Sequence, residues 1–197
     1  MRPQAFKVIT EPTSEPLSLA DAKDQCKSEL TEDNDRITFY IKAARQIAET
    51  HTRRCLMEQT VEAKYADWPD TGFGIWLPRP PAVSVTGVYY YDTDGTEQTL
   101  SSSVYELDAD SEPAQICLKP NQSWPALQTG KNNPIRVRYV AGHSSAANVP
   151  AATVQGIRLL VGTWFDHPKD TITGTIVQQL PMAAETLFAH DACWWGI

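Results

Sequence analysis

The sequence is poor in the residues from which catalytic and metal centres are usually built. Its 197 residues include only four cysteines and four histidines. The cysteines are far apart and form no CxxC pair, which argues against a zinc or dithiol redox motif. The histidines fit neither an HExxH nor an HxH pattern, and no glycine-rich phosphate loop is present. We therefore expect no bound metal or cofactor, and four reduced thiols: Cys26, Cys55, Cys117 and Cys193.

Long apolar runs are also missing. The longest, Ile157–Val161, is interrupted by Arg158, whereas a membrane-spanning helix needs about 20 apolar residues. Residues Met1–Phe6 lack the apolar core of a signal peptide. We expect no membrane partner, and a protein that is first present in the cytoplasm.

The sequence also lacks clusters of basic residues. Seventeen basic and 24 acidic residues give a net charge of −7, and residues 67–118 alone contribute −8. Without a basic stripe, sequence-specific DNA binding is disfavoured, although DNA could still slide past such a surface. The acidic surface is expected either to keep copies soluble and apart or to face a channel or a partner. Its candidate residues are Asp92, Asp94, Asp108, Asp110 and Glu112.

Helical periodicity is present at both ends of the chain. Ser18 has the position of an N-cap before a helix over 19–30, and the strongest pattern predicts a helix over 34–53. On that second helix we expect Arg45 and Glu49 on the polar, exposed face. An apolar stripe predicts a third helix after Pro150, and a last one is expected over about 182–191.

The middle of the chain reads as short β-strands, with a bulge expected at Gly87 and a hairpin turn over 92–95. The predicted fold class is α+β: a small bundle of about four α-helices with an inserted antiparallel β-domain. We expect an extended N-terminal arm and helical hairpin over 1–54, the β-domain over 55–142, and C-terminal helices over 143–197. The predicted strands cover 60–65, 75–77, 83–91, 96–100, 104–107, 115–118 and 135–140.

Three patterns allow other functions. His143 followed by Ser144 and Ser145 could supply a base and a nucleophile, but no GxSxG turn accompanies them, so a loop is favoured. A metal-dependent hydrolase could use the acidic cluster at 108–112, where a solvated loop is favoured. A carbohydrate-binding module could use Trp68, Trp76 and Trp124, but Trp68 and Trp124 each precede a proline, which favours packing in turns.

The C-terminal residues carry large apolar side chains where chain ends are usually polar. They either fold back on the core or dock on a partner, since aromatic anchors are enriched at interfaces. The docking candidates are Met182, Leu187, Phe188, Trp194, Trp195 and Ile197.

The order of these elements resembles the head-tail connector (adaptor) proteins of tailed bacteriophages, in the long form with a β insertion. Each motif is weak alone, and the order and spacing of all of them carry the resemblance. One departure is Arg53, where the family usually has a glycine after the long helix. The motifs are 8–12, 15–23, 41–45, 52–54, 77–81, 91–95, 123–125, 137–142 and 149–150.

The resemblance implies a structural virion protein and not an enzyme. It implies a ring of this chain, usually of twelve copies, located at the neck beneath the portal protein. Such a ring extends the DNA channel, helps to retain the genome and presents a platform for a stopper or tail-completion protein. Double-stranded DNA would pass through it without sequence-specific binding. By analogy, residues 182–197 would dock on the portal. A different neck or tail-completion protein is the nearest alternative.

Overall fold

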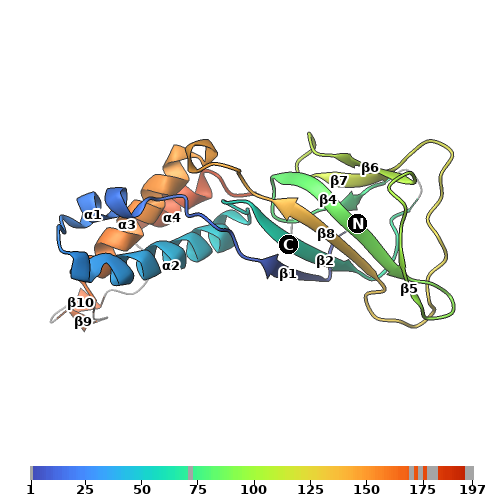
Figure 1. Cartoon of the computed structure of the whole chain (residues 1–197), viewed down its shortest axis with the longest axis horizontal. Coiled ribbons are helices and arrows are strands. Elements are labelled where there is room, and N and C mark those ends of the chain that lie inside the picture. The colour runs from blue at the N-terminus through green and yellow to red at the C-terminus, as the bar shows by residue number, and fades with distance from the viewer. Residues whose placement is uncertain (1, 71–72, 169–170, 173–174, 177–181, 194–197) are drawn as a thin grey trace. The chain divides into compact units, whose positions relative to one another are not determined.

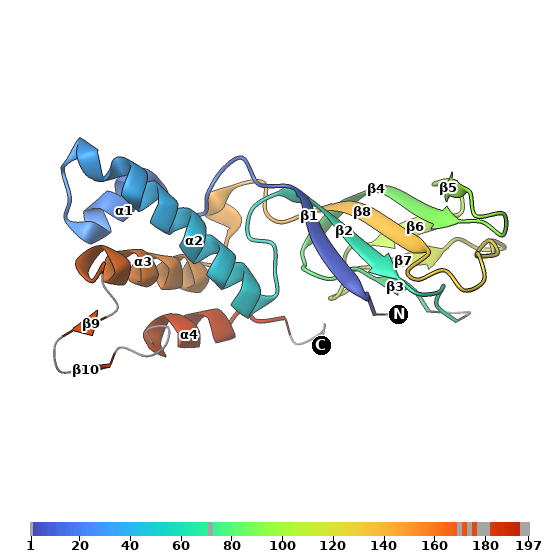
Figure 2. The ribbon, with the colours of Figure 1, turned by 90° about the horizontal axis from the view of Figure 1, so that it is seen from below.

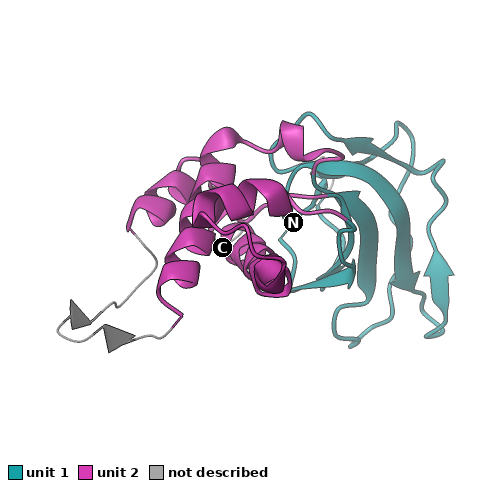
Figure 3. Ribbon diagram, turned by 60° about the vertical axis from the view of Figure 1, so that its left-hand side comes forward, with its two compact units in different colours: residues 1–13, 58–142, 193–197 teal, residues 14–57, 143–192 magenta. Residues whose placement is uncertain are grey.

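The computed structural model describes residues 2–70, 73–168, 171–172, 175–176 and 182–193. The fold is α+β, with four α-helices and antiparallel β-sheets in these residues (Figure 1). The chain divides into two compact units, coloured separately in Figure 3. The β unit comprises residues 1–13, 58–142 and 193–197, and the helical unit comprises residues 14–57 and 143–192.

The helical unit contains α1 (Leu19–Cys26), α2 (Asn34–Thr52), α3 (Ala151–Asp166) and α4 (Met182–Ala189). Helix α3 packs against each of the other three helices (Figure 2). Two short 3-10 helices, Thr31–Asp33 and Ala146–Asn148, precede α2 and α3. The apolar core of the unit is drawn from all four helices and includes Ile37, Ile41, Ala44, Leu56, Ile157, Leu160, Val161 and Phe188.

Local chemistry fixes the ends of the first two helices. The Ser18 side chain accepts a hydrogen bond from the Asp21 backbone N–H, as the sequence predicts for an N-cap. Helix α1 ends at Cys26, earlier than predicted, because Lys27 adopts the left-handed conformation with φ of 51°. Arg53 does the same after α2, with φ of 56°. The position at which the resembled family usually has glycine therefore does have a glycine-like backbone.

Two antiparallel sheets form the β unit. The larger has the strand order β1-β2-β8-β4-β5, and the smaller has the order β3-β7-β6. Gly87 lies at an irregularity in the pairing of β4 with β8, and Gly95 has φ of 80° in the turn before β5, as predicted. The strands are β1 (Ala5–Thr10), β2 (Gln59–Tyr65), β3 (Ile75–Trp76), β4 (Ala82–Tyr91), β5 (Glu97–Thr99), β6 (Tyr105–Asp108), β7 (Gln115–Leu118) and β8 (Ile135–Ala141).

Strand β1 was not expected from the sequence, which predicts only an extended arm there. Its backbone pairs with β2, with Lys7 opposite Glu62 and Val8 opposite Val61. A further pair of two-residue strands, β9 (Thr171–Ile172) and β10 (Thr175–Ile176), follows α3. No helix within the described ranges is long and apolar enough to span a membrane.

One face of the larger sheet forms the core of the β unit. Along β8 the buried side chains alternate with more exposed ones, and Val61, Ala63, Val137 and Tyr139 of β2 and β8 are fully buried. The hydroxyl of Tyr65 donates to the carbonyl of Trp76 in β3 at 2.6 Å, which joins the two sheets. The opposite face of the larger sheet carries charged side chains.

Candidate interaction surfaces

The C-terminal docking candidates occupy different environments. Phe188 is fully buried in the core of the helical unit. Its ring lies so close to α3 that a Cβ added at Gly156 would be 2.5 Å from it. Met182 is 81% exposed and Leu187 is half-buried. Of the described candidates, only Met182 and Leu187 therefore have side-chain surface to offer to a partner.

Trp194, Trp195 and Ile197 lie outside the described residues. The chain leading to them is held in place at Asp191. The Arg54 Nε donates to the Asp191 carbonyl at 2.7 Å and lies 3.2 Å from its carboxylate. Thr153 donates to the same carboxylate at 3.2 Å. The end of α2 and the first turn of α3 thus fix the point from which the C-terminal residues depart.

Helix α2 presents a second apolar surface. A shallow groove along it is lined by Ala43, Gln46, Ile47, Thr50 and His51. One turn before this groove, Phe39 is 69% exposed. Phe39 and this groove thus form an exposed apolar surface on α2.

The charged residues of α2 correct the predicted polar face. Arg45 is 1% exposed and Glu49 is 9% exposed. The Arg45 guanidinium contacts Glu15 at 2.7 Å and Glu49 at 2.9 Å. Glu49 also accepts a hydrogen bond from the Leu56 backbone N–H at 2.9 Å. The two residues are buried because they pair with each other and with the segments that enter and leave the helix, which a helical periodicity alone does not reveal.

Two of the acidic candidates have structural roles in turns. The Asp92 carboxylate accepts hydrogen bonds from the backbone N–H groups of Asp94 and Thr96 and from the Gln98 side chain. These bonds, that from Gln98 first, lower the pKa of Asp92. Asp94 is exposed in the same turn.

Asp108, the last residue of β6, stabilises the loop that leads to β7, as Asp92 stabilises its turn. Its carboxylate accepts hydrogen bonds from the Ser111 hydroxyl at 2.5 Å and from the backbone N–H groups of Asp110 and Ser111, and these lower its pKa. Asp110 and Glu112 are exposed. Over the described part of the chain, no group of three or more His, Cys, Asp or Glu residues is arranged to hold a metal ion.

The tryptophans and the His–Ser segment serve packing and capping. The indoles of Trp68 and Trp124 stack on each other with centroids 4.6 Å apart, and the Trp68 Nε1–H donates to the Pro125 carbonyl. One face of each indole ring is therefore covered by the other ring. Ser145 caps the following 3-10 helix by accepting from the Ala147 N–H. Burial lowers the pKa of His143.

The outer face of the larger sheet gathers basic residues that are far apart in the sequence. Lys7, Lys64, Arg136 and Arg138 come from β1, β2 and β8 and project from the face opposite the core. Glu62, only 4% exposed, pairs with Arg138 at 2.9 Å and with Arg136 at 3.5 Å. We refer to these four basic residues as the basic face. The sequence signal for them was the alternation of charged and apolar residues in β2 and β8.

Comparisons with known proteins give the fold of this chain a context. No protein-family model matches the sequence, and no curated protein sequence is significantly similar to it. Solved structures do match. A chain in the virion of a native gene transfer agent (GTA) particle aligns with a TM-score of 0.76 and 18% identity over 98% of both chains.

Two further structures of GTA particles agree. A chain in the neck of an empty particle, computed with C6 symmetry, has a TM-score of 0.74 and 17% identity. A chain in the neck of a native particle, computed with C12 symmetry, has a TM-score of 0.72 and 17% identity. Both alignments cover 98% of each chain. The fold of this protein is therefore that of chains found in the virion and neck of a phage-like particle.

Proposed function

We propose that this chain is a structural virion protein of the neck, a head-tail connector of the adaptor type. In this role it forms a ring under the portal, extends the DNA channel, helps to retain the packaged genome and provides the platform for tail attachment. The observation that carries the proposal is the match over 98% of both chains to a chain from a particle neck. The order of sequence motifs that resembles the adaptor family supports it independently.

The proposed partners follow from that role. A ring of twelve copies is supported by the C12 symmetry of one matching neck structure. The portal and a stopper or tail-completion protein would bind its two ends, and DNA would pass through without sequence-specific contacts. The protein would reside in the virion after an initial period in the host cytoplasm. We propose a structural and not an enzymatic role, because the matching chains come from the virion and neck of particles.

The test of the proposed function is the native mass of the full-length chain, measured alone and with a purified portal protein. We expect a complex with the portal that contains a closed ring of this chain. A chain that stays monomeric and ignores the portal at every concentration would overturn the proposal.

The proposed portal-docking segment can be tested without disturbing the core. Removing residues after Cys193 deletes Trp194, Trp195 and Ile197 and keeps α4, whose Phe188 the helical core requires. Met182→Ser and Leu187→Ser probe the exposed part of α4. Loss of portal binding with an unchanged thermal midpoint supports the docking role, and full portal binding by the truncated chain contradicts it.

A different neck or tail-completion protein remains the second candidate, because the matching structures are described as a virion and a neck and not by component. The particle that retains the protein distinguishes the two. A connector is expected on tailless heads, and a tail-completion protein on free tails.

A further inference from the structure

We propose that the basic face of the larger sheet docks the acidic loop 108–112 of a second copy of this chain. The inference rests on the proposed ring and names the surfaces through which neighbouring subunits would meet. It concerns residues of the β unit alone, and both surfaces are present in every copy.

The basic face is organised in rows across the sheet. Lys7 on β1 lies opposite Glu62 on β2, which lies opposite Arg138 on β8. In the next row Lys64 lies opposite Arg136. The two arginines are held in place by Glu62, so their positions are fixed before any partner arrives.

One aromatic ring, that of Tyr89 on β4, lies against the same face. The guanidinium groups of Arg136 and Arg138 lie 5.3 and 5.8 Å from the centre of the Tyr89 ring. Glu97 offsets part of the charge by pairing with Arg136 at 2.5 Å. Lys7 is exposed and Lys64 is half-buried, and neither has an ion-pair partner among the described residues. These two ammonium groups are therefore available to carboxylates from outside.

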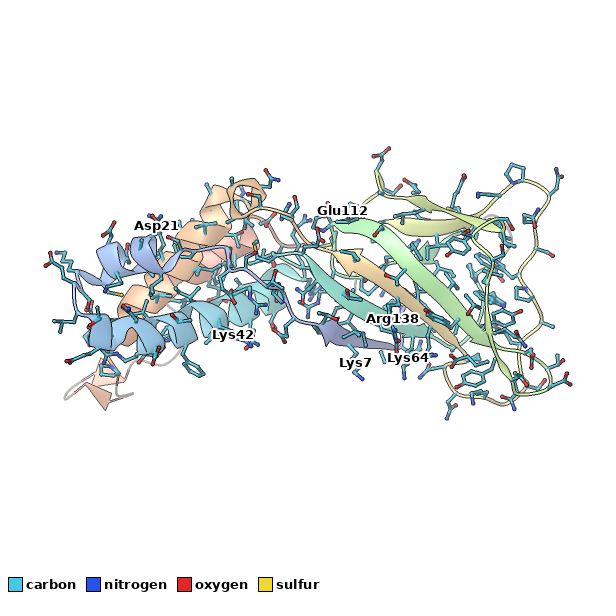
Figure 4. The ribbon with its side chains drawn as sticks, viewed as in Figure 1. Lys7, Asp21, Lys42, Lys64, Glu112 and Arg138 are labelled. Atoms are coloured by element: carbon cyan, nitrogen blue, oxygen red, sulfur yellow. The ribbon has the colours of Figure 1, made fainter. Side chains whose placement is uncertain are left out.

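The acidic loop has the complementary properties. The Asp108 carboxylate stabilises the loop by accepting hydrogen bonds from Ser111 and Asp110. That arrangement leaves Asp110 and Glu112 exposed on a fixed backbone. Figure 4 shows Lys7, Lys64 and Arg138 on one side of the β unit and Glu112 on another. The two surfaces are apart within one copy, so a contact between them would have to form between copies.

Ring geometry favours a second copy over DNA as the occupant. Closed rings use head-to-tail interfaces, in which two different surfaces of each subunit meet. Glu62 and Glu97 reduce the positive charge of the basic face, which weakens its attraction for a polyanion such as DNA. The acidic loop of a neighbour is a smaller target that four fixed or exposed cations suit.

The experiment uses zero-length carbodiimide cross-linking of the full chain, assembled with portal, as an equal mixture of ¹⁵N-labelled and unlabelled protein. We expect cross-links from Lys7 or Lys64 to Asp110 or Glu112 whose peptides combine labelled and unlabelled partners. Assembled rings without such mixed cross-links would overturn the inference while leaving the proposed function standing. Failure to assemble rings at all would overturn both.

A second experiment reverses the charges of the basic face and of the acidic loop. Lys7→Glu with Lys64→Glu should weaken ring assembly about tenfold or more, and Asp110→Lys with Glu112→Lys should do the same. An equal mixture of the two variants should assemble again, because each acidic surface then finds a basic one. The matched control is Asp67→Lys with Asp94→Lys, which makes the same charge change at exposed positions of the β unit.

Three results would count against the docking surfaces. The first is normal assembly of either reversed variant, and the second is assembly of neither the variants nor their mixture despite wild-type thermal midpoints. The third is normal assembly of the Lys7→Glu, Lys64→Glu variant combined with weaker retention of duplex DNA by its rings, which would identify the basic face as a DNA contact.

Discussion

The helical unit and the β unit use charge in opposite ways. In the helical unit the best-formed ion pairs are internal: Arg45 lies between Glu15 and Glu49, and Arg54 binds Asp191. In the β unit the nearly buried Glu62 also pairs with Arg136 and Arg138, but Lys7 and the acidic residues Asp94, Asp110 and Glu112 are exposed. Similar numbers of charged residues therefore stabilise the interior of the helical unit and lie largely at the surface of the β unit.

The first prediction has the largest expected effect and concerns Arg45, the buried cation of the helical unit. Arg45→Met should lower the free energy of unfolding by about 3–5 kcal/mol, because it leaves Glu49 buried without its partner. Chemical denaturation measures the effect. Arg158→Met is the control, since its pair with Asp21 is exposed and should contribute less than about 1 kcal/mol. Equal effects of the two variants would remove the distinction between internal and surface pairs.

The second test concerns packing between α3 and α4. Gly156→Ala should lower the free energy of unfolding by about 1–3 kcal/mol, because its methyl group would overlap the Phe188 ring. Gly162→Ala on the same helix meets only the flexible Gln25 side chain at 3.4 Å. That control should be neutral or stabilising by up to about 1 kcal/mol, from helix propensity. Phe188→Leu should partly rescue Gly156→Ala, and an undiminished defect in the double variant would contradict the proposed contact.

The third prediction concerns the pH dependence of stability that arises from His143 in the helical unit. Burial lowers the pKa of His143 from its ordinary value of 6.5, so the folded state binds its proton less readily than the unfolded state does. Stability from this group is complete above pH 6.5 and is lost as the pH falls below it. His143→Gln should therefore reduce the drop in thermal midpoint between neutral and mildly acidic pH, which thermal denaturation at a series of pH values measures. An unchanged pH dependence in His143→Gln would argue against this source.

The smallest expected effect lies in the turns of the β unit. The pKa of Asp92 is lowered from 3.8, mainly by the hydrogen bond from Gln98. Its stabilising contribution is thus present at neutral pH and is lost only as the pH falls below about 3.8. Asp92→Ala should slightly reduce the thermal midpoint at neutral pH, and Asp94→Ala, whose side chain is exposed, should leave it unchanged. If both variants behave alike, the turn does not depend on the Asp92 carboxylate.

Much of the fold was accessible from the sequence because local patterns determine it. The predicted helix over 34–53 corresponds to α2, Asn34–Thr52, and each predicted strand has a counterpart within a few residues. The exceptions depend on contacts between distant segments. Strand β1 exists through its pairing with β2, and Arg45 and Glu49 are buried through Glu15 and Leu56. Periodicity within one helix cannot show either.

The interaction surfaces were harder to predict for the same reason. Lys7, Lys64, Arg136 and Arg138 are separated by up to 131 positions along the chain, so a search for basic stripes does not find them. The acidic loop is visible in the sequence because Asp108, Asp110 and Glu112 lie within five residues of one another. Phe188 was grouped with the docking candidates by its apolar character alone, and the structure places it in the core because Gly156 leaves room for its ring.

The anchoring of Asp191 has a mechanical consequence. Arg54, just after the end of α2, and Thr153, in the first turn of α3, hold this residue. A pulling force applied beyond Asp191 would therefore be resisted by these contacts as well as by the packing of α4 on α3.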